Sequence, residues 1–143
     1  MKKALLTIVV LAMWFPVVCI GGEFSFFGVQ FGMTREEVDK AWKRLDTGEY
    51  YIKDSVVLNV KADFDYRDRL FELTFSVPLP DKYPAALVST AYQSLVSKMW
   101  QQPELNVNVR IGRGAAETTV TNKKLQKEYA EHIQTVLAPL LRP

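Results

Sequence analysis

The sequence predicts a two-layer α+β domain in which three helices cover one face of a mostly antiparallel sheet of four to five strands. Two observations favour this class. Segments with apolar residues at helical spacing alternate along the chain with short segments in which every second residue is apolar. Each alternating segment has one apolar and one polar side, which is typical of an antiparallel sheet covered on a single face. The expected element order is β-α-β-β-α-β-β-α, a ferredoxin-like arrangement with an added strand and helix.

Residues 1–22 have the features of a secretory signal peptide. Two lysines near the start precede an apolar run that ends at Ile20, and two glycines follow it. We therefore expect residues 23–143 to form a single periplasmic or secreted α+β domain. Two alternatives remain open. The apolar run is close to the roughly 17–25 residues that a membrane span needs, so it could stay as an anchor, and Cys19 could instead carry a lipid.

Composition excludes several classes of function. The chain has 18 basic and 16 acidic residues, but Lys2 and Lys3 belong to the expected signal peptide, which leaves 16 of each. No basic block remains that would favour nucleic acid or an anionic membrane surface. Cys19 is the only cysteine and His132 the only histidine, so an intrachain disulfide and a His/Cys zinc site are excluded. We expect no catalytic triad, no metal and no cofactor, which favours a non-catalytic role and leaves the question of enzymatic activity open.

The first two elements are expected to be a strand and a helix. Residues 24–31 predict the strand, because apolar residues alternate with Gly28 and Gln30 near its end. Thr34 and Glu37 have the spacing of a capping box, in which each side chain bonds to the other residue's backbone N–H. Apolar residues then recur at helical spacing as far as Leu45. The helix is therefore expected to begin at Thr34 and to reach Leu45.

The run F-G-V-Q-F-G-M-T-R-E-E-V, which ends at Val38, is similar to a known helix opening. It resembles the Gly-Met-Thr-x-x-(Glu/Gln)-Val motif of small exported lipoproteins of the SmpA/OmlA type, which serve outer-membrane assembly. The resemblance implies a helix followed by a two-stranded hairpin, here with a second strand that begins near Leu70, and a role in binding other envelope proteins. It implies no particular binding residue in this chain.

The rest of the chain predicts four more strands and two helices. In residues 56–66 the even-numbered positions, Leu58 among them, are expected to face the core. The later elements are a strand over 71–77, a helix from Pro84 with core residues such as Leu87 and Leu95, a strand over 105–111, a turn over 112–114, a short edge strand over 117–121, and a helix capped by Asn122 with Leu125, Tyr129, Ile133, Val136 and Leu140 at core spacing.

The loop of the first hairpin decides which side chains lie opposite one another. Directly opposed residues of an antiparallel pair share a face, which excludes a three-residue loop unless a bulge intervenes. A two-residue loop of the favoured type would require positive φ at both positions. We therefore expect residues 67–70 to form a four-residue loop. It would place Phe64 opposite Leu73 and Asp65 opposite Glu72.

Polar side chains on the uncovered face form the candidate binding site. The carboxylates there lack the glycine and the final glutamate of a calcium-binding loop, so no metal site is expected. The candidate binding residues are Lys61, Asp63, Asp65, Glu72, Asn108 and Arg110.

These features favour an exported, non-catalytic interaction module that binds another envelope protein through the open sheet face or a sheet edge. The alternative is a domain that binds a small ligand or divalent cation, or a weak hydrolase, through Asp63, Asp65 and Glu72. A pocket that reaches these three carboxylates would be required for the alternative, whereas a flat face would favour the interaction module.

Overall fold

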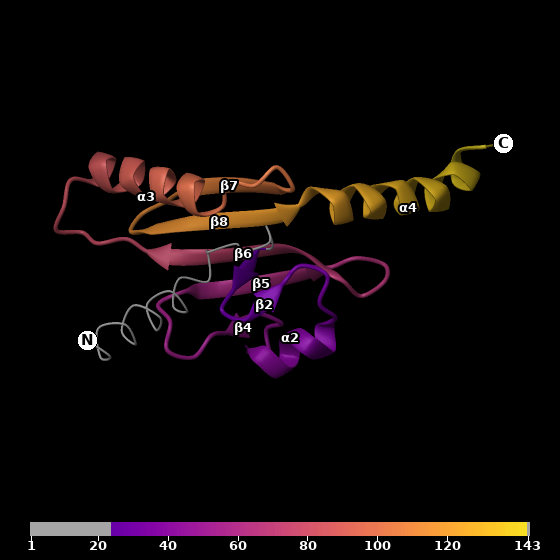
Figure 1. Cartoon of the computed structure of the whole chain (residues 1–143), viewed down its shortest axis with the longest axis horizontal. Helices are drawn as coiled ribbons and strands as arrows, with labels where there is room; N and C mark the ends of the chain where they lie inside the picture. Colours follow the sequence, from indigo (N-terminus) through magenta and orange to yellow (C-terminus); the bar gives the residue numbers. More distant parts are fainter. Residues whose placement is uncertain (1–23, 143) are drawn as a thin grey trace, which may run out of the picture.

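The computed structural model describes residues 24–142 and has an α+β fold (Figure 1). The expected signal peptide, with the anchor and lipid alternatives, lies outside these residues. The elements are, in chain order, β1 (Ser25–Phe26), β2 (Val29–Gln30), α2 (Arg35–Ala41), β3 (Lys43–Arg44), β4 (Tyr50–Tyr51), β5 (Leu58–Phe64), β6 (Leu70–Pro78), α3 (Ala85–Met99), β7 (Leu105–Ile111), β8 (Ala115–Asn122) and α4 (Lys123–Leu141).

The larger sheet is antiparallel, with its six strands in the order β3-β4-β5-β6-β8-β7. The expectation of four to five strands is therefore wrong for this sheet, since the short strands β3 and β4 were not predicted. The expectation of an edge strand over 117–121 is also wrong. β8 lies between β6 and β7, and its Ala116, Thr118 and Val120 are fully buried. The outermost strand on that side is β7.

Residues 24–31 form a small hairpin and not the single strand that was expected. β1 pairs with β2, with Phe26 opposite Val29. The chain reverses at Phe27 and Gly28, whose φ angles are 49° and 83°. Such values are uncommon for a residue other than glycine. The turn places Phe26 and Val29 in the core and leaves Phe27 exposed.

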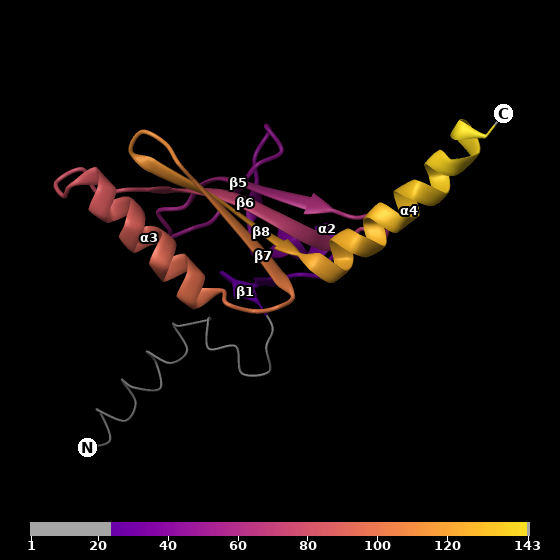
Figure 2. The same ribbon diagram turned by 90° about the horizontal axis from the view of Figure 1, so that it is seen from above.

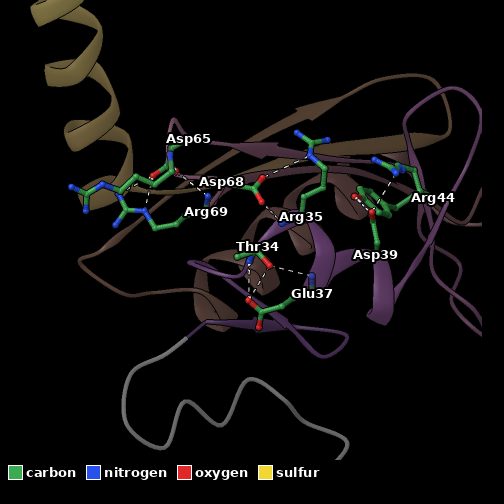
Figure 3. A network of polar contacts seen from close by, with 10 residues as sticks. Thr34, Arg35, Glu37, Asp39, Arg44, Asp65, Asp68 and Arg69 are labelled. Atoms are coloured by element: carbon green, nitrogen blue, oxygen red, sulfur yellow. Dashed lines mark hydrogen bonds and ion pairs between the residues drawn. The ribbon is translucent and has the colours of Figure 1, made fainter.

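The start of α2 is confirmed and its expected end is wrong. The Glu37 N–H donates to the Thr34 hydroxyl at 3.3 Å, and the Thr34 N–H donates to the Glu37 carboxylate at 3.1 Å (Figure 3). The helix stops at Ala41, because Trp42 adopts an extended conformation. The Trp42 indole N–H donates to the Phe27 carbonyl at 3.1 Å. This contact holds the ring against the β1–β2 hairpin.

One buried cluster joins α2, the β1–β2 hairpin and the C-terminal end of α3 to the same face of the sheet. Val38 lies in α2, Trp42 follows directly after α2, and Val96 lies in α3. Phe75 and Val120 are the sheet residues at the centre of the cluster. These elements therefore cover one face of the sheet, and the polar side chains of the strands lie on the opposite face.

The third helix does not cover the sheet, so the expectation of three helices on one face is wrong. Asn122 caps α4 as predicted, accepting the Leu125 N–H at 3.0 Å. From there α4 extends away from the end of the sheet (Figures 1 and 2). Only Leu125 of the predicted stripe is buried, and Leu140 is 75% exposed. Leu87 and Leu95 of α3 are likewise exposed, so its core-facing stripe is narrower than predicted.

The predicted register of the β5–β6 hairpin is wrong, because the loop is shorter than expected and two bulges interrupt the pairing. Phe64 lies opposite Leu70, and Asp63 lies opposite Glu72. The loop holds three residues between Asp65 and Arg69, with the Asp65 N–H donating to the Arg69 carbonyl at 2.9 Å. This is the three-residue loop that required a bulge.

The second bulge changes the face of one apolar residue. β5 advances three residues between the pairs Leu58–Ser76 and Lys61–Thr74, while β6 advances two. The extra residue is Asn59, whose φ is 54°. Leu58 therefore lies opposite Ser76 and is 55% exposed, which corrects its expected place in the core.

Replacement of Thr34 by alanine tests the capping box. We expect Thr34→Ala to lower the free energy of unfolding by about 1 kcal/mol, because the Glu37 N–H loses its acceptor. Urea unfolding followed by circular dichroism measures the change. Thr34→Ser is the matched control, since it keeps the hydroxyl, and it should stay close to the wild type. Equal losses in both variants would contradict a capping role.

Candidate interaction site on the open sheet face

The strand pairing arranges the polar side chains of the open face in three cross-strand rows. Each row contains one residue from β5, β6, β8 and β7, in that spatial order. The first row is Asp63, Glu72, Thr121 and Asn106, the second is Lys61, Thr74, Thr119 and Asn108, and the third is Leu58, Ser76, Glu117 and Arg110. Five of the six predicted binding residues belong to these rows, and Asp65 does not.

The outer strands carry most of the exposed side chains of this face. Lys61 and Asp63 on β5 are exposed, and so are Asn108 and Arg110 on β7. Adjacent strands are about 4.8 Å apart, so the two exposed pairs are separated by roughly 14 Å across the sheet. They form one surface but cannot converge on a single atom of a small substrate.

The central strands carry four hydroxyl side chains and two longer carboxylates, Glu72 on β6 and the exposed Glu117 on β8. The hydroxyls of Thr74 on β6 and Thr119 on β8 are 3.3 Å apart and share a hydrogen bond. Thr119 is half-buried, and Thr121 is only 4% exposed. In the second row, short polar side chains therefore lie between the longer side chains of Lys61 and Asn108.

Glu72, half-buried on β6, has a raised pKa. Burial raises the pKa of Glu72, and the negative charge of Asp63, directly opposite on β5, raises it further. Like charges facing each other across a strand pair are unfavourable. The row that contains these two carboxylates therefore favours a positively charged group from a binding partner.

Asp65 belongs to the hairpin turn and not to the open face, in contrast to its expected position opposite Glu72. Its Oδ1 accepts the backbone N–H groups of Arg67 and Arg69, both at 2.9 Å, and its Oδ2 accepts the Arg69 Nε–H at 2.9 Å (Figure 3). Burial raises the pKa of Asp65, but these hydrogen bonds outweigh that effect, so its pKa lies below the ordinary value. Its role is to fix the turn.

Side chains of the same hairpin contact the first half of α4 and fix its position. The Arg69 guanidinium bridges Asp65 and Glu128, with 2.9 Å to each carboxylate. The Tyr66 ring stacks on His132 with centroids 3.9 Å apart, and Phe71 packs edge-on against Tyr129. His132, the only histidine, is thus a packing residue at the junction of hairpin and helix.

A pocket lies beside β7 and contains none of the predicted carboxylates. It has a volume of about 570 Å³ and is lined by residues of the α3 C-terminus, the following loop and β7. The lining residues are Ser97, Trp100, Gln101, Gln102, Pro103, Leu105 and Val107. Leu105 and Val107 alternate with the polar residues of β7, so this pocket opens on the side of the sheet away from the open face.

Among residues 24–142, no group of three or more histidine, cysteine, aspartate or glutamate side chains is arranged to hold a metal ion. No helix in this part of the chain has both the length and the apolar character needed to cross a bilayer.

Comparison of the chain with protein-family models, curated proteins and solved structures finds no match. The resemblance to SmpA/OmlA-type proteins therefore rests on residues 27–38 alone, and the site must be interpreted from its own geometry.

Sequence reasoning missed the contribution of β8 to the open face. Glu117, Thr119 and Thr121 occupy the third strand of the rows. The alternation of these three polar residues with the apolar Ala116 and Val120 is the signal in the sequence that could have indicated their place on this face. The threonines suggested an exposed edge strand, because threonine is polar and favours strands.

Replacement of Asp65 tests its role in the turn. Asp65→Ala should lower the free energy of unfolding at neutral pH by about 2–3 kcal/mol, because several charge-assisted hydrogen bonds are lost. The Asp65 pKa is below its unfolded value near 3.8, so its contribution is complete above that pH and is lost as the pH falls through the folded pKa. The difference between variant and wild type should therefore shrink below about pH 4.

Asp63→Ala is the matched control for this experiment, since Asp63 is an exposed aspartate two residues away. It should change stability by less than about 0.5 kcal/mol. Urea titrations of the three proteins at several pH values give the comparison. An Asp65→Ala protein as stable as the control at neutral pH would show that the turn does not depend on this carboxylate.

Proposed function

We propose that this chain is an exported, non-catalytic interaction module of the cell envelope that binds another protein through the open sheet face. The observation that carries the proposal is the alignment of three cross-strand rows, polar except for Leu58, over four strands of the face that α2 and α3 leave uncovered. The features of residues 1–22 and the SmpA/OmlA-like opening support the envelope location.

The shape of the face suits a protein partner. Its exposed charges are Lys61 and Asp63 on one outer strand, Arg110 on the other, and Glu117 on β8 opposite Arg110. Short hydroxyl groups lie between them. A face of this kind can accept an extended polar surface with charges of both signs, since complementary charges fix the register and orientation of a protein complex.

The alternative of a ligand site built from three carboxylates is less well supported. Both carboxylate oxygens of Asp65 accept hydrogen bonds within the hairpin turn, so only Asp63 and Glu72 of these three carboxylates lie on the face. The pocket beside β7 opens away from both. We therefore propose protein binding in place of small-molecule chemistry.

A photoreactive residue placed in the middle of the face tests the proposal in cells. Thr119, half-buried at the centre of the second row, is the position for the probe, and exposed Leu87 on α3 is the matched control. Irradiation should link position 119 to one specific envelope protein and should not link position 87 to that protein.

Charge reversal then shows whether the captured protein uses the face. Lys61→Glu combined with Arg110→Glu should strongly reduce the yield of the crosslink at position 119. Lys98→Glu, an exposed lysine on α3, should leave the yield unchanged. A crosslink that is equal at both probe positions, or that survives the double charge reversal, would refute binding through this face.

A further inference from the structure

The two edges of the large sheet differ in how they are protected. At one edge, β3 is two residues long and consists of Lys43–Arg44. Short length and positive charge are devices by which proteins prevent unwanted strand pairing. At the other edge, β7 has seven residues, pairs with β8 without a bulge, and contains no proline, glycine or lysine. Figure 1 shows β7 as the outermost strand. Among residues 24–142, Arg110 is the one feature of this edge strand that corresponds to such a device.

The backbone groups on the free side of β7 can be assigned from its hydrogen-bonding pattern. The Gly112 N–H donates to the Ala115 carbonyl at 2.9 Å, and the Lys123 N–H donates to the Glu104 carbonyl at 2.8 Å. Antiparallel pairs alternate between bonded and non-bonded, so the even-numbered residues of β7 bond to β8. The odd-numbered residues, Val107, Val109 and Ile111, direct their N–H and C=O groups outward. Within residues 24–142 no other backbone group bonds to them.

We propose that β7 pairs antiparallel with β7 of a second copy of this chain, about a two-fold axis at Asn108. This is the register in which all seven residues of the strand are paired. The outward backbone groups of Val107 then meet those of Val109 in the second copy. The two sheets become one continuous sheet of twelve strands, and the open face becomes twice as wide.

The side chains are complementary in this register. Asn108 lies opposite its own copy, where two amides can donate to and accept from each other. Arg110 lies opposite Asn106 of the second copy, so no like charges face each other across the junction. A register centred on Arg110 would instead oppose two guanidinium groups, which is unfavourable.

The pocket beside β7 also favours a second copy of this chain as the partner of this edge. Ile111 is 37% exposed, although it is a large apolar residue on a strand. In the proposed register it lies opposite Leu105 of the other copy and on the same face. Leu105, Val107 and Trp100 line the pocket of about 570 Å³. Each copy therefore supplies an apolar side chain to the pocket of the other, as expected for an isologous interface.

This pairing goes beyond the proposed function and does not depend on it, because it uses the sheet edge and not the face. A dimer without any envelope partner would leave the pairing intact. Conversely, a monomer that captures a partner at Thr119 would support the proposed function and overturn the pairing.

Single-cysteine variants test the register directly. In a Cys19→Ser background, Asn108→Cys places two cysteines at a non-bonded pair with Cα atoms about 4.5 Å apart, within the range for a disulfide. Mild oxidation should give a disulfide-linked dimer. Asn106→Cys is the matched control, since its two copies lie four residues apart along the strands, about 13 Å, and should not crosslink. Equal crosslinking of both variants, or none, would overturn the proposal.

Charged variants at the same position test the two-fold axis without oxidation. Asn108→Lys and Asn108→Asp each place like charges opposite one another, so each protein alone should lose the dimer in sedimentation velocity. An equimolar mixture should recover it as a heterodimer. Circular dichroism of each variant checks folding, and the cysteine pair decides if either variant fails to fold. A wild-type protein that stays monomeric at high concentration, or a mixture that does not recover the dimer, would also refute the pairing.

Discussion

The arrangement of the layers depends on the aromatic packing around Phe75. Phe75 lies on β6, a central strand, and is 1% exposed. The ring of Phe26 stacks on it with centroids 4.5 Å apart, and the ring of Trp100 meets it edge-on at 5.8 Å. These three rings join the N-terminal hairpin, the sheet and the end of α3. Because aromatic side chains bury large apolar areas, this cluster commits one face of the sheet to the core and leaves the other face to solvent.

Local signals predicted the starts of elements better than their ends. The capping residues Thr34 and Asn122 were identified correctly, because a cap is formed by residues three apart in the sequence. The end of α2 depends instead on the bond between the Trp42 indole and the Phe27 carbonyl. That bond exists only because residues 24–31 turn back on themselves. Tertiary contacts of this kind have no counterpart in the spacing of apolar residues.

The candidate site was predictable to the extent that it follows from strand alternation. Lys61, Asp63 and Glu72 lie on the expected face, but the three-residue loop and the bulge beside it changed their partners. The alternation of apolar and polar residues along the strands does not show where the bulges lie. β8 was mistaken for an edge because of its threonines. Thr118 is fully buried, yet its hydroxyl lies 2.6 Å from that of Tyr92, so a hydrogen bond offsets the cost of its burial.

The position of β8 between β6 and β7 also sets the order in which the chain can complete its sheet during folding. The strands β3 to β6 are consecutive in sequence and in space, so their pairing needs only short loops to close. Thr74 and Thr119, by contrast, are 45 residues apart. β7 precedes β8 in the sequence but pairs only with β8. Until β8 has joined the sheet, the apolar strand β6 therefore keeps an unpaired edge that is exposed to aggregation.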